Sequence, residues 1–271
     1  MADIHITAVI AQGAQIADDV SIGPYCCVGG NVTLGAGVVL HSHVVIDGDT
    51  EVGAGGQIYP FASVGLPPQD TKFGGELSKL VIGENTTIRE HCTLNPGTQG
   101  GGMITRVAKD CLLMVGVHVA HDCMIEEGAI IVNNVILGGH VTIGEHAIVG
   151  GHSAVHQFVR IGAYAMIGGA SALDGDVIPY GLVLGNRAVL TGLNLVGLKR
   201  RGISREIIRQ LREAYREIFF GDGIMKDRLP EVGSRFPDNA FVQDVVGFLS
   251  GDGSRPLCKP QPDQPKSNDA S

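Results

Sequence analysis

Residues 16–46 read IADDVSIGPYCCVGGNVTLGAGVVLHSHVVI, and an aliphatic side chain stands at every sixth position of this stretch. A helix repeats every 3.6 residues and a half-buried strand every two, so neither produces this spacing. A short fixed period indicates a repeat architecture, and this one predicts a parallel β-helix. The aliphatic series runs through Ile10, Ile16, Ile22, Val28, Leu34, Leu40, Ile46, Val52, Ile58 and Val64, then Ile82, Ile88 and Leu94, then Val107, Leu113, Val119, Ile125, Ile131, Leu137, Ile143, Val149, Val155, Ile161, Ile167 and Leu173.

The spacing of the series converts into geometry. Three six-residue units form one triangular coil of such a helix, so residues 18 apart stack roughly one strand spacing from each other, about 4.8 Å. The series is interrupted at residues 66–80 and 99–106, which carry polar residues and glycine. We expect these two segments to leave the coil as loops and to form walls of a functional site.

Composition agrees with a helix of small coils. The chain of 271 residues holds 40 glycines and no tryptophan, so small and branched aliphatic residues must fill the core. No apolar stretch approaches the roughly 20 residues of a membrane span. The opening MADIHITAVIAQ lacks the features of a signal peptide. We expect a cytoplasmic protein without a membrane span.

The charge is unevenly distributed along the chain. The formal net charge of −8 argues against nucleic-acid binding. Residues 1–190 contain seven basic side chains, whereas residues 199–216 alone contain seven more. This basic segment is either a solvated helix face or a patch for an anionic partner.

The repeat ends near residue 190, which predicts a β-helix over 1–190 with the two loop insertions. Residues 191–252 form a predicted helical domain, in which Ser204 is a candidate N-cap before REIIRQLREAYREIFF. A second amphipathic helix is expected around AFVQDVVGFL. Residues 253–271 are rich in proline and polar residues, and we expect them to be disordered.

Stacking by 18 residues selects one group among the many histidines of the later coils. His121 is followed 18 residues later by Gly139 and then by Gln157, while Asp122 is followed by His140. His118 lies in the same coil as His121. A histidine, an unobstructed backbone and polar neighbours are therefore expected on one small surface.

This surface has the parts of an acyl-transfer site. An imidazole with a pKa near 6.5 can remove a proton from an attacking alcohol, and His121 is the candidate base. Gly139 presents a backbone N–H without a side chain, as an oxyanion on a thioester carbonyl requires. The alternative is that these histidines are only turn residues of a non-catalytic repeat module.

Metal chemistry is the rival interpretation of the histidines. Some hexapeptide-repeat proteins are carbonic anhydrases that bind zinc through three histidines. The spacings His118-x-x-His121 and His152-x-x-x-His156 do not look like that arrangement. We predict no metal.

Six segments occur in order that together resemble one family, the UDP-N-acetylglucosamine O-acyltransferases that begin lipid A synthesis. The segments are QDTKFGGE, GTQGGGMITRV, HVAHDC, LGGH, AVHQF and GLKRRGISRE, within a similarity that covers about residues 3–250. The resemblance implies a homotrimer of left-handed β-helices with sites between subunits. It also implies transfer of an (R)-3-hydroxyacyl group from acyl carrier protein to the 3-hydroxyl of the sugar nucleotide. No cofactor is expected, because the carrier protein brings its own 4'-phosphopantetheine.

The resemblance assigns His121 as general base and Gly139 as oxyanion donor, and it assigns acidic acyl carrier protein to the basic segment. Residues expected to contact the sugar nucleotide, acyl chain or pantetheine are Gln69, Asp70, Lys72, His118, Asp122, His140, His156, Gln157, Gly169, Arg187, Asn194 and Arg200.

Three positions bear on specificity. Gly169 resembles the position that measures acyl length, Arg187 replaces a histidine of some relatives, and Val196 replaces an acidic residue. Some relatives acylate a 3-amino sugar, so that acceptor stays open. The later N-acyltransferase of the same pathway normally carries an additional N-terminal domain, whereas the repeats here start by Ile10. That difference weighs against it.

Overall fold

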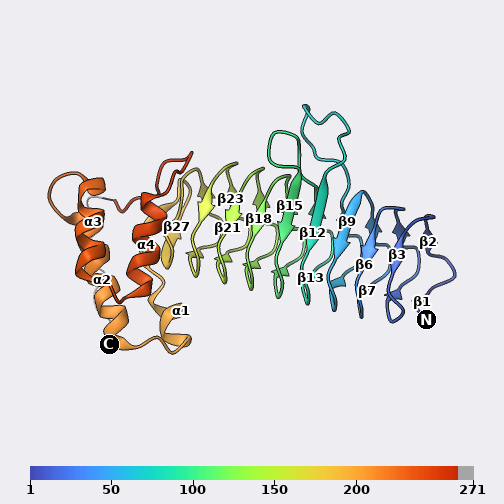
Figure 1. Ribbon diagram of the computed structural model, residues 1–271, viewed down its shortest axis with the longest axis horizontal. Helices are drawn as coiled ribbons and strands as arrows, with labels where there is room; N and C mark the ends of the chain where they lie inside the picture. Colours follow the sequence, from blue (N-terminus) through green and yellow to red (C-terminus); the bar gives the residue numbers. More distant parts are fainter. Residues whose placement is uncertain (262–271) are drawn as a thin grey trace.

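The computed structural model describes residues 1–261 and consists of a long prism of coils with helices at its C-terminal end (Figure 1). The chain visits three sheets in turn, parallel except for the last strand pair, and each sheet forms one face of the prism. The predicted parallel β-helix with a C-terminal helical region is confirmed.

Most strands have only two residues, because each face of a coil is short. The first face contains, in spatial order, β1 (Asp3–Ile4), β4 (Ser21–Ile22), β7 (Val39–Leu40), β10 (Gln57–Ile58), β13 (Thr87–Ile88), β16 (Leu112–Leu113), β19 (Ile130–Ile131), β22 (Ile148–Val149), β25 (Met166–Ile167), β27 (Gly181–Leu184) and β28 (Val189–Leu193). The second face contains β2 (Val9–Ile10), β5 (Cys27–Val28), β8 (Val45–Ile46), β11 (Ser63–Val64), β14 (Thr93–Leu94), β17 (His118–Val119), β20 (Ile136–Leu137), β23 (Ala154–Val155) and β26 (Ala172–Leu173). The third face contains β24 (Arg160–Ile161), β21 (Thr142–Ile143), β18 (Met124–Ile125), β15 (Ile104–Val107), β12 (Lys79–Ile82), β9 (Asp49–Val52), β6 (Thr33–Leu34) and β3 (Gln15–Ile16).

The register follows the repeat. His118 pairs with Ile136 and Ile136 with Ala154, each 18 residues further on. The aliphatic series points inward and is buried from Ile22 to Leu173, whereas Ile10 and Ile16 at the open end are only partly buried. The core is therefore a column of stacked aliphatic layers.

Two loops leave the prism on the same side (Figure 1). The first loop occupies residues 65–78 between β11 and β12, and the second occupies 95–103 between β14 and β15. The Gln99 N–H donates to Glu76 Oε1 at 3.0 Å and joins the loops. That bond lowers the pKa of the Glu76 carboxyl, since it stabilises the charged form.

An antiparallel pair, β27 and β28, ends the coil, and four helices follow within residues 1–261. They are α1 (Leu195–Arg200), α2 (Arg205–Phe220), α3 (Met225–Arg235) and α4 (Ala240–Ser250). Ser204 caps α2 as predicted, since its side chain accepts from the Ile207 N–H. None of the helices in residues 1–261 has the length and apolar character needed to cross a membrane.

The segment after α4 differs from its predicted disorder. Pro256 O accepts from the Asp176 N–H at 2.7 Å, and the Cys258 N–H donates to Asp176 O at 2.9 Å. Cys258 is buried. Residues 253–259, here called the strap, therefore pack along the last coil. Backbone N–H and C=O groups of that coil that have no next coil to bond with pair with the strap instead. Residues 262–271 of the predicted tail lie outside the described residues.

Candidate active site

His121 and Asp122 form a hydrogen-bonded pair at the turn that follows β17. His121 Nδ1 lies 2.7 Å from Asp122 Oδ2, and the Asp122 carboxylate is fully buried. A carboxylate at Nδ1 keeps the proton on that nitrogen and leaves Nε2 as the acceptor. The arrangement thereby leaves His121 Nε2 able to accept a proton.

Asp122 is held in place by the second loop. The Thr98 N–H donates to Asp122 Oδ1 at 2.9 Å, and the Thr98 hydroxyl donates to Oδ2 at 2.6 Å. The Asp122 N–H donates to Thr105 Oγ1 at 2.7 Å. A Cβ on Gly101 would lie 2.0 Å from the carboxylate carbon, so the loop packs directly on this group. The two Thr98 donors and His121 together satisfy the buried charge.

Gly139 faces His121 one coil further along. A Cβ at Gly139 would stand 2.5 Å from His121 Cε1 and 2.7 Å from Nε2, which confirms the stacking expected from the 18-residue spacing. Its carbonyl accepts from the Phe158 N–H at 3.0 Å. Within residues 1–261 no hydrogen bond uses the Gly139 N–H. Gly139 is buried in the single chain, and its N–H is a donor without a protein partner among the described residues.

His140 and His118 are the histidines nearest the pair in the adjoining turn and strand. The His140 ring stacks on Phe158 at 4.3 Å, and its Nε2 lies 3.8 Å from Asp122 Oδ2. Burial lowers the pKa of His140, against the opposing effect of Asp122. His118 Nδ1 lies 2.7 Å from Thr93 Oγ1. Burial lowers the pKa of His118, and the neighbouring His121 lowers it further by charge repulsion. In both rings burial therefore favours the neutral form.

The first loop brings Asp70 to the same place. Asp70 Oδ2 lies 4.0 Å from His121 Nε2, and its Oδ1 accepts from the Lys72 N–H at 3.0 Å. The side chains of Gln69 and Lys72 are exposed beside it. A ligand at His121 would meet this loop.

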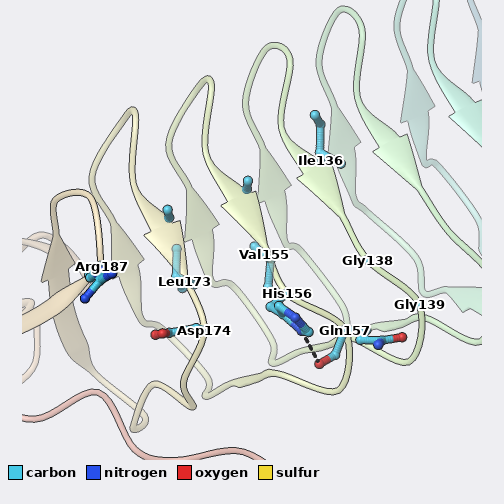
Figure 2. A pocket seen from close by; sticks show the side chains of 11 residues that line it. Ile136, Gly138, Gly139, Val155, His156, Gln157, Leu173, Asp174 and Arg187 are labelled. Carbon is cyan, nitrogen blue, oxygen red and sulfur yellow. Dashed lines mark hydrogen bonds between the residues drawn. The ribbon is translucent and has the colours of Figure 1, made fainter.

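A groove of about 480 Å³ extends from Gly139 along the second face (Figure 2). Its floor is formed by outward side chains of paired strands, Ile136, Ala154 and Ala172. Gly139 and Gln157 lie at one end of the groove, and Arg187 lies at the other (Figure 2). The remaining lining residues are Gly138, Val155, His156, Leu173 and Asp174.

The other expected contact residues lie outside the groove wall. Gly169 is exposed on the turn after β25, where a Cβ would be 3.2 Å from Gly151 O. Asn194 caps α1: its Oδ1 accepts from the Gly197 N–H, and its Nδ2 donates to Tyr164 O. Arg200 is exposed at the end of α1. In the single chain Asn194 has a structural role that the sequence did not indicate.

One trio of side chains has the proximity of a metal site. Ligand atoms of His121, Asp122 and His140 lie within 4.8 Å of one another. The Asp122 oxygens already accept from Thr98 and His121, so a cation would displace these bonds. The absence of a metal remains a prediction.

Sequence reasoning missed three supports of the site. Thr98 and Thr105 fix Asp122, and Thr93 contacts His118. The first two lie inside the segment GTQGGGMITRV, but nothing in its letters shows that the loop folds back onto a buried carboxylate.

Comparison with known proteins agrees with the geometry. Residues 13–48 match the bacterial transferase hexapeptide family, and residues 176–258 match domain 2 of UDP-N-acetylglucosamine O-acyltransferase. The coil and these family matches thus define a hexapeptide-repeat acyltransferase, with the left-handed β-helix of that class.

Full-length relatives narrow the class further. The chain is 52% identical over 256 residues to the acyl-(acyl-carrier-protein)–UDP-N-acetylglucosamine O-acyltransferase of Rickettsia canadensis, covering 94% of this chain and 97% of the relative. It is 51% identical to the Azorhizobium caulinodans enzyme of that name, with 95% of each covered. The UDP-N-acetylglucosamine O-acyltransferase structure from Moraxella catarrhalis superposes with a TM-score of 0.91 at 44% identity, covering 94% of this chain and 99% of that one. The chain belongs to the UDP-N-acetylglucosamine O-acyltransferase family.

Proposed function

We propose that the protein transfers an (R)-3-hydroxyacyl group from acyl carrier protein to the 3-hydroxyl of UDP-N-acetylglucosamine. The observation that carries this proposal is His121, which is backed by buried Asp122 and faces Gly139, whose N–H has no protein partner among the described residues. Membership of the family supplies the donor and acceptor classes, since relatives named for this reaction match almost the whole chain.

In the reaction, His121 Nε2 accepts the proton of the sugar hydroxyl as its oxygen attacks the thioester carbonyl. The carbonyl oxygen gains negative charge and accepts a hydrogen bond from the Gly139 N–H. The C–S bond then breaks, the new ester forms, and the imidazolium returns its proton to the thiolate of phosphopantetheine. Asp122 stabilises the imidazolium while it carries this proton.

The surroundings suit the two substrates. The acyl chain lies along the apolar floor of Ile136, Ala154 and Ala172, and Arg187 bears on its length at the far end. The sugar nucleotide lies between the first loop and the two flanking histidines. Residues proposed to bind one substrate or the other are Gln69, Asp70, Lys72, His118, Asp122, His140, His156, Gln157, Gly169, Arg187, Asn194 and Arg200.

Partners follow from charge and apolar surface. The exposed arginines of α1 and α2, including Arg200, Arg205 and Arg216, suit acidic acyl carrier protein. The first face carries outward apolar side chains on consecutive strands, namely Leu112, Ile130, Ile148 and Met166. This column supports assembly with further copies into a homotrimer. We place the reaction in the cytoplasm as the first step of lipid A synthesis, without a resident cofactor.

A direct assay tests the proposal. The purified protein is incubated with 3-hydroxyacyl carrier proteins of graded length, and with both the 3-hydroxy and the 3-amino forms of the sugar nucleotide. Transfer to the 3-hydroxyl form is expected. Preference for the 3-amino form would move the activity to N-acylation, and no transfer from any donor would favour a non-catalytic repeat module.

A further inference from the structure

The strap carries an arginine from the far end of the chain to the backbone of Gln157, one of the residues that line the groove. Arg255 Nε donates to the backbone carbonyl of Gln157 at 2.8 Å, across 98 residues of sequence. The same carbonyl lies 3.2 Å from His156 Nδ1. Arg255 is half-buried, and the groove is lined by both His156 and Gln157.

The strap is fixed to the last coil on both sides of Arg255. After Arg255, the two backbone bonds described above join the strap to Asp176. Before it, a Cβ on Gly253 would lie 2.5 Å from Arg160 Nη2, so the strap backbone packs closely on that side chain. Arg160 is held in turn by buried Asp176, since its Nε donates to Oδ2 at 2.7 Å. These contacts set the place from which Arg255 reaches the groove.

The Gln157–Phe158 peptide links Arg255 to the reacting centre. Its C=O accepts from Arg255, and its N–H, that of Phe158, donates to Gly139 O at 3.0 Å. A charged donor at the carbonyl polarises the peptide and strengthens the bond that its N–H makes. The Phe158 ring also stacks on His140. One peptide therefore connects the strap to both Gly139 and His140.

We propose that Arg255 is a positioning residue of the acyltransferase site, which holds Gly139 in its oxyanion-binding orientation through the Gln157–Phe158 peptide. Arg255 acts without touching the substrate. The inference rests on the proposed function, and it gives the C-terminal strap a role in turnover.

The test compares Arg255→Met, Arg255→Lys and a control variant in the full-length protein. Arg255→Met keeps the length of the side chain but removes its donors, and kcat is expected to fall about tenfold, less than the loss of a direct oxyanion donor. KM for both substrates and the melting temperature should stay near wild type. Arg255→Lys should recover part of kcat, because an ammonium can still donate to Gln157 O.

The control is Lys259→Ala, which removes an exposed cation from the same strap. The carbonyl of residue 259 accepts from the Leu190 N–H at 3.2 Å, and this backbone bond is retained in the variant. Lys259→Ala should therefore leave kcat unchanged.

Three results would overturn the inference while the wild-type enzyme is active. They are an unchanged kcat in Arg255→Met, a raised KM with unchanged kcat, which would make Arg255 a ligand-binding residue, and an equal loss in Lys259→Ala. Absence of transfer by the wild-type protein would instead overturn the proposed function, and this inference with it.

Discussion

The N-terminal and C-terminal halves of the prism are built from the same repeat, yet they use histidine differently. His43 and His140 have nearly the same left-handed backbone, with φ of 59° and 61°. The His43 ring is exposed and lies 5.0 Å from both Tyr25 and Phe61. The His140 ring stacks on Phe158 but also lies 3.8 Å from the buried carboxylate of Asp122.

The difference lies in what surrounds the turn. The repeat supplies equivalent turn positions in every coil. Where nothing else surrounds such a turn, as at His43, its aromatic side chains only stack on one another at the surface. In the later coils a buried carboxylate orients His121, and two loops bring Thr98 onto that carboxylate and Asp70 beside the ring. A histidine in this fold becomes a candidate base through its support rather than through its place in the repeat.

The largest effect is expected for His121→Ala, which is compared with the same change at His43 in the N-terminal half. His121→Ala should lower kcat by on the order of a thousandfold, because the general base is lost. His43→Ala, the matched control, should turn over normally. Steady-state acyl transfer measures both variants, and circular dichroism checks that each is folded. Near-normal turnover by folded His121→Ala would contradict the assignment.

Asp122→Asn tests whether the buried carboxylate makes the difference. The amide introduced at position 122 has one acceptor oxygen in place of two and no negative charge, so it cannot accept from both Thr98 and His121. We therefore expect kcat to fall about a hundredfold. Stability should also drop, and activity is therefore compared at a temperature where the variant is folded. An unchanged kcat would show that His121 needs no carboxylate.

Gly139→Ala probes the close approach of two coils. The backbone of Gly139 is not left-handed, so alanine is tolerated there, but its Cβ would displace the His121 ring. Turnover should fall roughly tenfold through misplacement of the base. Gly247→Ala in α4, where a Cβ meets open space, is the control and should keep full activity. Equal activity of the two variants would count against the facing arrangement.

The smallest effect concerns pH. The pKa values of His118 and His140 lie below the ordinary 6.5 in the folded protein, mainly through burial. The unfolded chain therefore binds more protons as pH falls through 6.5, and stability should decrease from about pH 7.5 to about pH 5.5. Denaturant unfolding at several pH values measures this slope. His118→Asn should make stability depend less steeply on pH. An unchanged slope in this variant would contradict the assignment of the pH dependence to His118.

The sequence predicted well whatever depends on periodicity. A six-residue period requires stacked coils, so the fold, the inward aliphatic series and the contact between His121 and Gly139 could all be predicted from spacing. The N-cap at Ser204 is equally local, because a hydroxyl reaches an N–H three residues on. The short helix α1 and helix α3, which contains Pro230, lack so clear a pattern.

Only the tertiary structure decided the contacts made by segments without a period. Thr98 reaches Asp122 from a loop, Asn194 uses its side chain for a helix cap, and the strap packs on the last coil although its composition suggested disorder. The physical reason is the same in each case. Local sequence sets repeat geometry and caps, whereas a loop or tail takes its conformation from the unsatisfied groups and surfaces that it meets after folding.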